Sequence, residues 1–179
     1  MNECILDHLS QILMLDYDGV LHSNFPKQSR PPEERQPFCY LPRLESVLRR
    51  HPDVGIVITS THRLGTSLGQ LTRKFSPDIR ARVLGSTPVL ANNSSGPGSR
   101  HREVLAWLKQ NGFEDLPWIA LDDIAELYQT GACLVVTDEG FRDQEEEDLE
   151  AALADPVAWA QSHPVPAPDT TNKLWVPTR

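Results

Sequence analysis

The sequence is poor in cysteine and has no long apolar run, and each shortage excludes a class of protein. Its 179 residues include three cysteines, Cys4, Cys39 and Cys133, with no CxxC spacing. So sparse and odd a set predicts reduced thiols and no disulfide framework. No apolar run approaches the roughly 20 residues that a membrane-spanning helix needs. The first apolar stretch is broken by polar residues, unlike a signal peptide. We therefore expect a soluble, cytoplasmic protein with no membrane partner.

Basic residues are also in short supply. Lys and Arg total 17 against 25 Asp and Glu, which gives a formal net charge of −8. This balance disfavours a long nucleic-acid footprint, because such a footprint needs many cationic contacts to phosphates. The 39% hydrophobic content is ordinary for a globular protein, and the length fits a single domain.

Four short and nearly continuous apolar runs divide the chain. They cover residues 11–15, 55–58, 117–121 and 133–136. Continuous runs are typical of strands buried on both faces of a parallel sheet. A fifth run, residues 81–84, fits either a further strand or a loop anchor. Helical spacing of apolar residues occupies residues 41–50 and 102–110, and an acidic helix is expected to begin near Asp143.

Strands that alternate with helices predict a doubly wound, Rossmann-like α/β fold with a mostly parallel sheet. Between the predicted elements lie a proline-rich loop over residues 25–37 and a flexible connection over residues 92–99, so we expect no sizeable cap domain. Five prolines from Pro156 onward predict an extended tail that either wraps the domain or frays. We therefore divide the chain into one domain, residues 1–155, and a proline-rich C-terminal tail, residues 156–179.

Polar residues follow three of the four predicted strands. They are Asp16 and Asp18 after the first run, Thr59 and Ser60 after the second, and Asp122 and Asp123 after the third. In an open α/β sheet, ligands bind beyond the carboxyl ends of the strands. These side chains are therefore expected to meet at one edge, with the residue types that phosphate chemistry needs.

The segment Asp16-Tyr17-Asp18-Gly19 carries two acids that can divide a phosphoryl transfer between them. One carboxylate can attack phosphorus and form an aspartyl-phosphate. The other can protonate the leaving oxygen and later activate water. The alternative is a strand-end Asp followed by an ordinary turn at Asp18-Gly19. The apolar strand before the segment and Val20-Leu21 after it favour catalysis.

The other two strand ends supply a phosphate cradle and a cation site. Thr59 and Ser60 offer a hydroxyl and backbone N–H groups to phosphate oxygens, although a helix cap is the alternative. Adjacent acids such as Asp122 and Asp123 repel one another unless a cation lies between them, and helix-start acids are the alternative there. Magnesium prefers few carboxylates together with water and substrate phosphate. A fixed cation for the phosphate is available from Arg100 or Arg102.

In this order the motifs resemble the haloacid dehalogenase (HAD)-type phosphatase superfamily, over about residues 11–138. The resemblance implies a doubly wound fold with bound Mg²⁺. It makes Asp16 the nucleophile and a metal ligand, and Asp18 the acid–base residue with its backbone carbonyl on the metal. It adds Asp122 and the neighbouring Asp123 as ligands, Thr59 as a phosphate contact, and Arg100 as the residue that steadies the phosphate.

A closer likeness is to the small HAD domain of Swiss-army-knife RNA-repair proteins. It rests on residues 41–50, 56–63, 100–108 and 118–123. The likeness aligns Arg100, Glu103 and Trp107 with one helical motif, and Thr137-Asp138 with an acidic position after the last strand. That branch usually has Trp where this chain has His62, which either contacts substrate or is an exposed helix-start residue.

An uncapped site should stay open, and within the superfamily an open site often implies a large substrate. We group Thr59, Ser60, Arg63 and Arg100 as substrate-binding residues. Further basic residues form either a positive edge or an ordinary solvated surface: Arg73, Lys74, Arg80 and Arg82. With a net charge of −8, contact with nucleic acid would be limited to an end.

The sequence thus predicts a Mg²⁺-dependent phosphomonoester hydrolase, with a phosphorylated substrate such as a nucleic-acid end. Two alternatives stay open. One is a phospho-acceptor module like a receiver domain, although receiver domains place their acidic pair and acceptor on different strands. The other is a degenerate domain kept for protein interaction, against which the intact Asp16, Asp18 and Asp122 argue.

Overall fold

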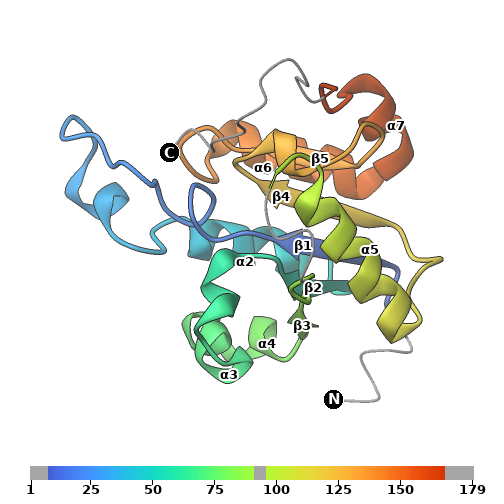
Figure 1. Ribbon diagram of the computed structural model, residues 1–179. Helices are drawn as coiled ribbons and strands as arrows, with labels where there is room; N and C mark the ends of the chain where they lie inside the picture. Colours follow the sequence, from blue (N-terminus) through green and yellow to red (C-terminus); the bar gives the residue numbers. More distant parts are fainter. Residues whose placement is uncertain (1–7, 91–95, 168–179) are drawn as a thin grey trace.

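A five-stranded, all-parallel sheet forms the centre of the molecule. The computed structural model describes residues 8–90 and 96–167. The strands follow the order β3-β2-β1-β4-β5 across the sheet (Figure 1). They are β1 (Gln11–Leu15), β2 (Val54–Ile58), β3 (Val83–Ser86), β4 (Trp118–Asp122) and β5 (Leu134–Val136). The predicted Rossmann-like α/β fold is confirmed, and the described residues contain no large cap domain.

Helices cover both faces of the sheet. Alternate strand residues such as Leu13 and Ile56 share one core with α2 (Leu41–Arg50) and α6 (Asp143–Ala154). Residues of the opposite parity, including Met14 and Val57, pack with α5 (Ser99–Asn111) in a second core. Successive strand residues point to opposite faces, so a strand covered on both sides is apolar throughout. This explains the continuous runs of the sequence.

Between β2 and β3 the chain forms short helical turns that the sequence pattern did not reveal. They are η2 (Thr61–Leu64), α3 (Leu68–Leu71), η3 (Thr72–Lys74) and α4 (Pro77–Arg80). Helices of one turn bury too few residues to produce a helical period in the sequence. The predicted loop over residues 25–37 includes the 3₁₀ turn η1 (Pro32–Arg35) and extends away from the sheet (Figure 1).

The prediction of an extended tail from Pro156 is wrong for the first seven residues. They form α7 (Pro156–Ser162), in which the proline occupies a first-turn position where it is tolerated. The carboxylate of Asp155 caps the helix by accepting a 2.9 Å hydrogen bond from the backbone N–H of Ala158. Trp159 is buried and donates through Nε1 to the carbonyl of Leu134 at 2.9 Å. The division after residue 155 therefore separates two helices, α6 and α7, that share one core. Residues 168–179 of the predicted tail lie outside the described part.

Two further predictions concern thiols and membranes. Cys39 and Cys133 are free, and burial raises the pKa of the Cys133 thiol to about 12. Cys4 lies outside the described residues. Within the described ranges, none of the helices has the length and apolar character that a membrane crossing requires.

Candidate active site

Backbone hydrogen bonds bring the ends of β1, β2, β4 and β5 to one edge. The N–H of Asp16 donates to the carbonyl of Leu121 at 3.0 Å, one residue beyond β1. Thr59 N–H reaches the carbonyl of Leu15 at 2.8 Å in the same way. On the other side of β4, Thr137 N–H donates to the carbonyl of Asp122 at 3.0 Å. The sheet ladder thus fixes the predicted site residues next to one another.

Three carboxylates gather at this edge. Asp16, Asp122 and Asp123 each offer an oxygen within 4.8 Å of the others. Asp122 is fully buried, and its Oδ1 accepts from the backbone N–H of Ile124 at 3.0 Å. Its Oδ2 accepts from the hydroxyl of Tyr128 at 2.9 Å. The acids that the sequence placed on two separate strands therefore form one cluster.

Arg100, the first basic residue of α5, is the cation of this cluster. Its Nη1 lies 2.7 Å from Oδ2 of Asp16 and also donates to Oδ2 of Asp122. Burial works against the charge, but Asp122 and Asp16 outweigh it and raise the pKa of the guanidinium. Arg102, the alternative in the sequence, instead donates through Nη1 to the carbonyl of Pro97 at 3.1 Å. Of the two arginines, Arg100 is the one in contact with the cluster.

One guanidinium does not balance three carboxylates. Burial raises the pKa of Asp123 to about 7, and the neighbouring Asp122 and Asp16 add to the shift. Burial also raises the pKa of Asp122, although Arg100 opposes this. The elevated pKa values indicate that the positive charge of Arg100 does not fully offset the burial and mutual repulsion of the ionised carboxylates. A hard divalent cation with oxygen ligands fits this donor set, and Asp16, Asp122 and Asp123 would hold it.

Gly19 lets the β1 loop approach Asp123. Its φ of 70° is left-handed, and a Cβ at this position would overlap the Asp123 carboxylate. The carbonyl of Gly19 accepts a 2.7 Å hydrogen bond from Oγ1 of Thr137, which anchors the turn to β5. Asn24 steadies the acid from the solvent side, with Nδ2 2.9 Å from its Oδ2. Only a glycine allows so close an approach.

Asp18 stands apart from the three-acid cluster. Its carboxylate is partly exposed, and Oδ1 lies 3.3 Å from Nε2 of His22 and 3.1 Å from Nε2 of His62. Burial lowers the pKa of His22, and Asp18 partly counteracts this. The side chain of Asp18 thus has different partners from that of Asp16, as an acid–base residue separate from a nucleophile would. Its proposed metal contact through the backbone carbonyl stays a prediction.

The predicted phosphate cradle contains an unsatisfied hydroxyl. Thr59 is fully buried, and among the described residues its Oγ1 has no hydrogen-bond partner. Buried hydroxyls usually have a partner, so an orphan beside the acid cluster is notable. Ser60 uses its Oγ to accept from the backbone N–H of His62 at 3.4 Å, which caps η2.

Arg63, which the sequence grouped with the substrate-binding residues, bonds to other parts of the protein. Its side chain is buried against Glu103 of α5, with which it forms an ion pair. Its other nitrogens donate to backbone carbonyls, at 2.6 Å to Thr59, 3.1 Å to Ser60 and 3.0 Å to Thr87. Arg63 therefore fixes the ends of β2 and β3, and its donors are occupied by the protein itself.

Two of the arginines considered for a positive edge also donate hydrogen bonds to backbone carbonyls. Arg82 is buried and donates to the carbonyls of Val54, Leu48 and His51. Arg80 donates to the carbonyls of Thr72, Arg73 and Phe75. Of the two, only Arg82 is removed from the surface, because Arg80 is exposed.

Sequence reasoning missed Tyr128 and Asn24, which bond to the acid cluster and lie outside the strand-end motifs. The resemblance had aligned Thr137-Asp138 with an acidic position, but the bond from Thr137 to the Gly19 carbonyl emerges only in the structure. His22 follows Asp18 by four residues, and no periodic pattern marks it.

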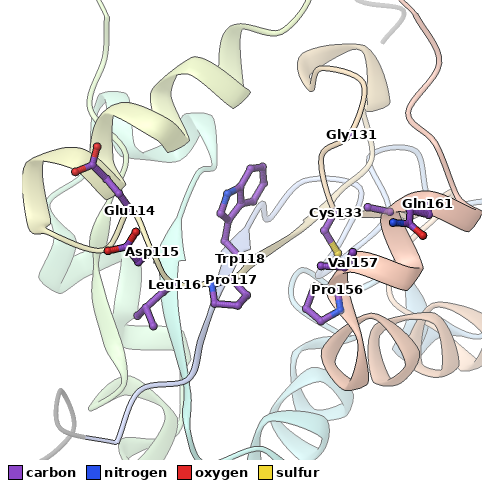
Figure 2. A pocket seen from close by; sticks show the side chains of 11 residues that line it. Glu114, Asp115, Leu116, Pro117, Trp118, Gly131, Cys133, Pro156, Val157 and Gln161 are labelled. Carbon is purple, nitrogen blue, oxygen red and sulfur yellow. The ribbon is translucent and has the colours of Figure 1, made fainter.

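A separate cavity of about 520 Å³ lies at the amino ends of β4 and β5. Figure 2 shows Trp118 and Cys133 between the loop that carries Glu114 and Asp115 and helix α7. None of the predicted site residues lines this cavity. The chemistry of the strand ends is therefore on the opposite edge of the sheet.

Comparison with known proteins gives one match. A family model described as the HAD domain in Swiss Army Knife RNA repair proteins matches residues 12–146. This range includes the three-acid cluster, Thr59, Arg63, Arg100 and both histidines beside Asp18. No curated protein and no solved structure matches the chain.

Proposed function

The chain belongs to the family of HAD domains in Swiss Army Knife RNA repair proteins, and from this membership and the site we propose that it is a Mg²⁺-dependent phosphomonoester hydrolase. The observation that carries the proposal is the cluster of Asp16, Asp122 and Asp123, whose oxygens lie within 4.8 Å of one another. A purely structural domain gains nothing from three acids around one arginine, because unbalanced buried charge is costly.

Asp16 is the nucleophile in this proposal. Its Oδ1 accepts from the backbone N–H of Tyr17 at 2.8 Å, and Oδ2 accepts from Arg100. These donors fix the orientation of the carboxylate. As an Asp16 oxygen bonds to phosphorus, the bond from phosphorus to the leaving oxygen breaks, and Asp18 gives its proton to that oxygen. Asp18 is then a carboxylate that accepts a proton from water, whose oxygen attacks phosphorus and releases Asp16.

Thr59 and Arg100 hold the phosphoryl group. The orphan Oγ1 of Thr59 can donate to a phosphate oxygen, which gives this buried hydroxyl the partner it lacks. Arg100 stays beside Asp16 and offsets the negative charge of the transferred group. Bound at Asp16, Asp122 and Asp123, Mg²⁺ would supply further positive charge to the phosphate oxygens.

We propose a large substrate such as the phosphorylated end of a nucleic acid, handled in the cytoplasm. The absence of a large cap among the described residues supports this, because such a substrate needs an uncovered site. The net charge of −8 and the burial of Arg63 and Arg82 support contact with an end, not with a long tract.

The test is hydrolysis of p-nitrophenyl phosphate by the full chain, with and without Mg²⁺, for wild type and Asp16→Asn. We expect activity that requires Mg²⁺ and falls at least about 10³-fold in the variant, as for loss of a nucleophile. Oligonucleotides phosphorylated at the 3′ or 5′ end, compared with small esters, then test the substrate class. Equal rates for wild type and Asp16→Asn would contradict the proposal. A stable phosphorylated Asp16 without turnover would instead favour a phospho-acceptor module.

A further inference from the structure

Two histidines from different elements meet at one oxygen of Asp18. His22 belongs to the loop after β1, and His62 to η2 after β2. Both approach Oδ1 of Asp18 through Nε2, at 3.3 Å and 3.1 Å. Among the described residues, no hydrogen bond or ion pair involves Oδ2 of the same carboxyl group. The two oxygens of this acid therefore have different environments.

Both imidazoles occupy the same carboxyl oxygen. Nε2 of His62 is within hydrogen-bond distance of Oδ1, and Nε2 of His22 makes an ion-pair contact with it from the other element. With Oδ1 held in this way, Oδ2 is the Asp18 oxygen that is left to meet a substrate.

A row of aromatic rings holds the two imidazoles in place. Phe38 packs against His22 with ring centroids 5.1 Å apart and against Tyr17 at 5.5 Å. Tyr17 continues the row to His62, at 5.9 Å. Tyr17 is itself buried and tied through its hydroxyl to the carbonyl of Leu71 at 3.1 Å. The row therefore connects both histidines to the core.

The backbone of Phe38 provides an independent observation. Its φ of 62° is left-handed, the one such value at a non-glycine position in the described chain. A bulky residue in this region is strained, and strain of this kind persists where the surrounding structure demands it. Here it places the Phe38 ring between Tyr17 and His22.

We propose that His22 and His62 are positioning residues that hold the Asp18 carboxyl group by Oδ1, so that Oδ2 faces the leaving oxygen. This rests on the proposed function. The pair then matters most for esters whose leaving group is an alkoxide, such as a sugar hydroxyl, because an alkoxide departs only when protonated. A phenolate such as p-nitrophenolate departs without this help.

The experiment compares kcat and KM for β-glycerophosphate and p-nitrophenyl phosphate. The variants are His62→Ala, His62→Gln and, as a matched control, His8→Ala at an exposed position before β1. We expect His62→Ala to lower kcat/KM, which reports the step in which the leaving oxygen departs, on the order of 10-fold on the glycerol ester and less than about 3-fold on the nitrophenyl ester, within the general-acid range. KM should change little, and His62→Gln should recover part of the loss because its amide N–H can replace Nε2–H. His8→Ala should match wild type on both esters.

The outcomes separate the two proposals. An equal loss of kcat/KM on both esters, or a change in KM alone, would overturn the positioning role in leaving-group departure while the phosphatase proposal stands. Equal inactivity of wild type and Asp16→Asn on both esters would overturn both. If His22→Ala fails to fold, since this ring is half-buried, the His62 series still decides the question, because His62 is exposed.

Discussion

Nη1 of Arg100 lies 2.7 Å from Oδ2 of Asp16, and both side chains are buried. The same nitrogen donates to Asp122, so one guanidinium holds together carboxylates from two adjacent strands. The contact joins the start of α5 to the carboxyl edge of the sheet. Helix α5, which covers one face of the fold, therefore also supplies the fixed charge of the site.

Arg100→Ala is expected to destabilise the fold by about 3–5 kcal/mol near pH 7, because it leaves buried carboxylates unpaired. The loss should shrink at acid pH, where the carboxylates become neutral, and Mg²⁺ should restore part of it. Urea unfolding with and without Mg²⁺ measures both effects. Arg73→Ala, on an exposed side chain, is the matched control and should stay within about 0.5 kcal/mol of wild type. An Arg100→Ala protein as stable as the control would contradict the balance of charge described here.

Thr59→Val should weaken phosphate binding without lowering the stability of the fold. The hydroxyl it removes has no partner in the described structure, so the free energy of unfolding should be unchanged or higher. Inorganic phosphate should nonetheless inhibit the variant more weakly, which a competition assay measures. Thr137→Val is the contrasting variant, because it deprives the Gly19 carbonyl of its donor and should cost about 1–3 kcal/mol. Strong destabilisation by Thr59→Val would mean that its hydroxyl serves the fold.

The three central strands β1, β2 and β4 were predictable because they are buried on both faces. β1 was predicted with the bounds it has, Gln11–Leu15, and the other strands within about two residues. The uncertain run at residues 81–84 overlaps β3, an edge strand that has a pairing partner only in β2. Helix α7 was missed because the five prolines from Pro156 onward outweighed Trp159, and only the packed fold shows that Trp159 reaches Leu134.

Only the site residues that lie at strand ends were predictable from the sequence. Asp16, Thr59 and Asp122 meet because parallel strands end at one edge, which alternating elements already imply. The partners of Arg63 were not predictable, because its ion pair with Glu103 spans 40 residues and depends on how α5 lies on the sheet. Tyr128 and the two histidines at Asp18 were not predictable either. They reach the site from loops and short 3₁₀ turns, which show no hydrophobic periodicity in the sequence.

Gly19→Ala is expected to damage both the fold and the metal site. Any L-residue at this left-handed φ is strained, and here its Cβ would also displace the Asp123 carboxylate. Gly112→Ala is the control, because Gly112 has a φ of 73° but open space around it. The control should cost about 1–2 kcal/mol from backbone strain alone. Gly19→Ala should cost more and should abolish the rise in Tm on Mg²⁺ addition, which Gly112→Ala keeps. Equal behaviour of the two would contradict the close approach.

Trp159→Ala should show that α7 belongs to the domain. The side chain is buried and bonded to β5, so we expect a loss of about 3–5 kcal/mol in urea unfolding. Val157→Ala, on the exposed side of the same helix, should stay within about 0.5 kcal/mol of wild type. If both variants matched wild type, residues 156–162 would be an appendage, as the proline content first suggested.

Mg²⁺ should stabilise the protein more as pH rises. In the metal-free fold the pKa of Asp123 is about 7, well above the value of roughly 3.9 for an unfolded chain. The folded state therefore holds the extra proton between these values, and metal-free stability falls as pH rises through that range. Mg²⁺ binds the ionised carboxylates, so its affinity rises over the same range. The Tm increase at saturating Mg²⁺ should be larger near about pH 8 than near about pH 5.5. Asp123→Asn should weaken this dependence, and a Tm increase independent of pH in wild type would argue against metal binding at this cluster.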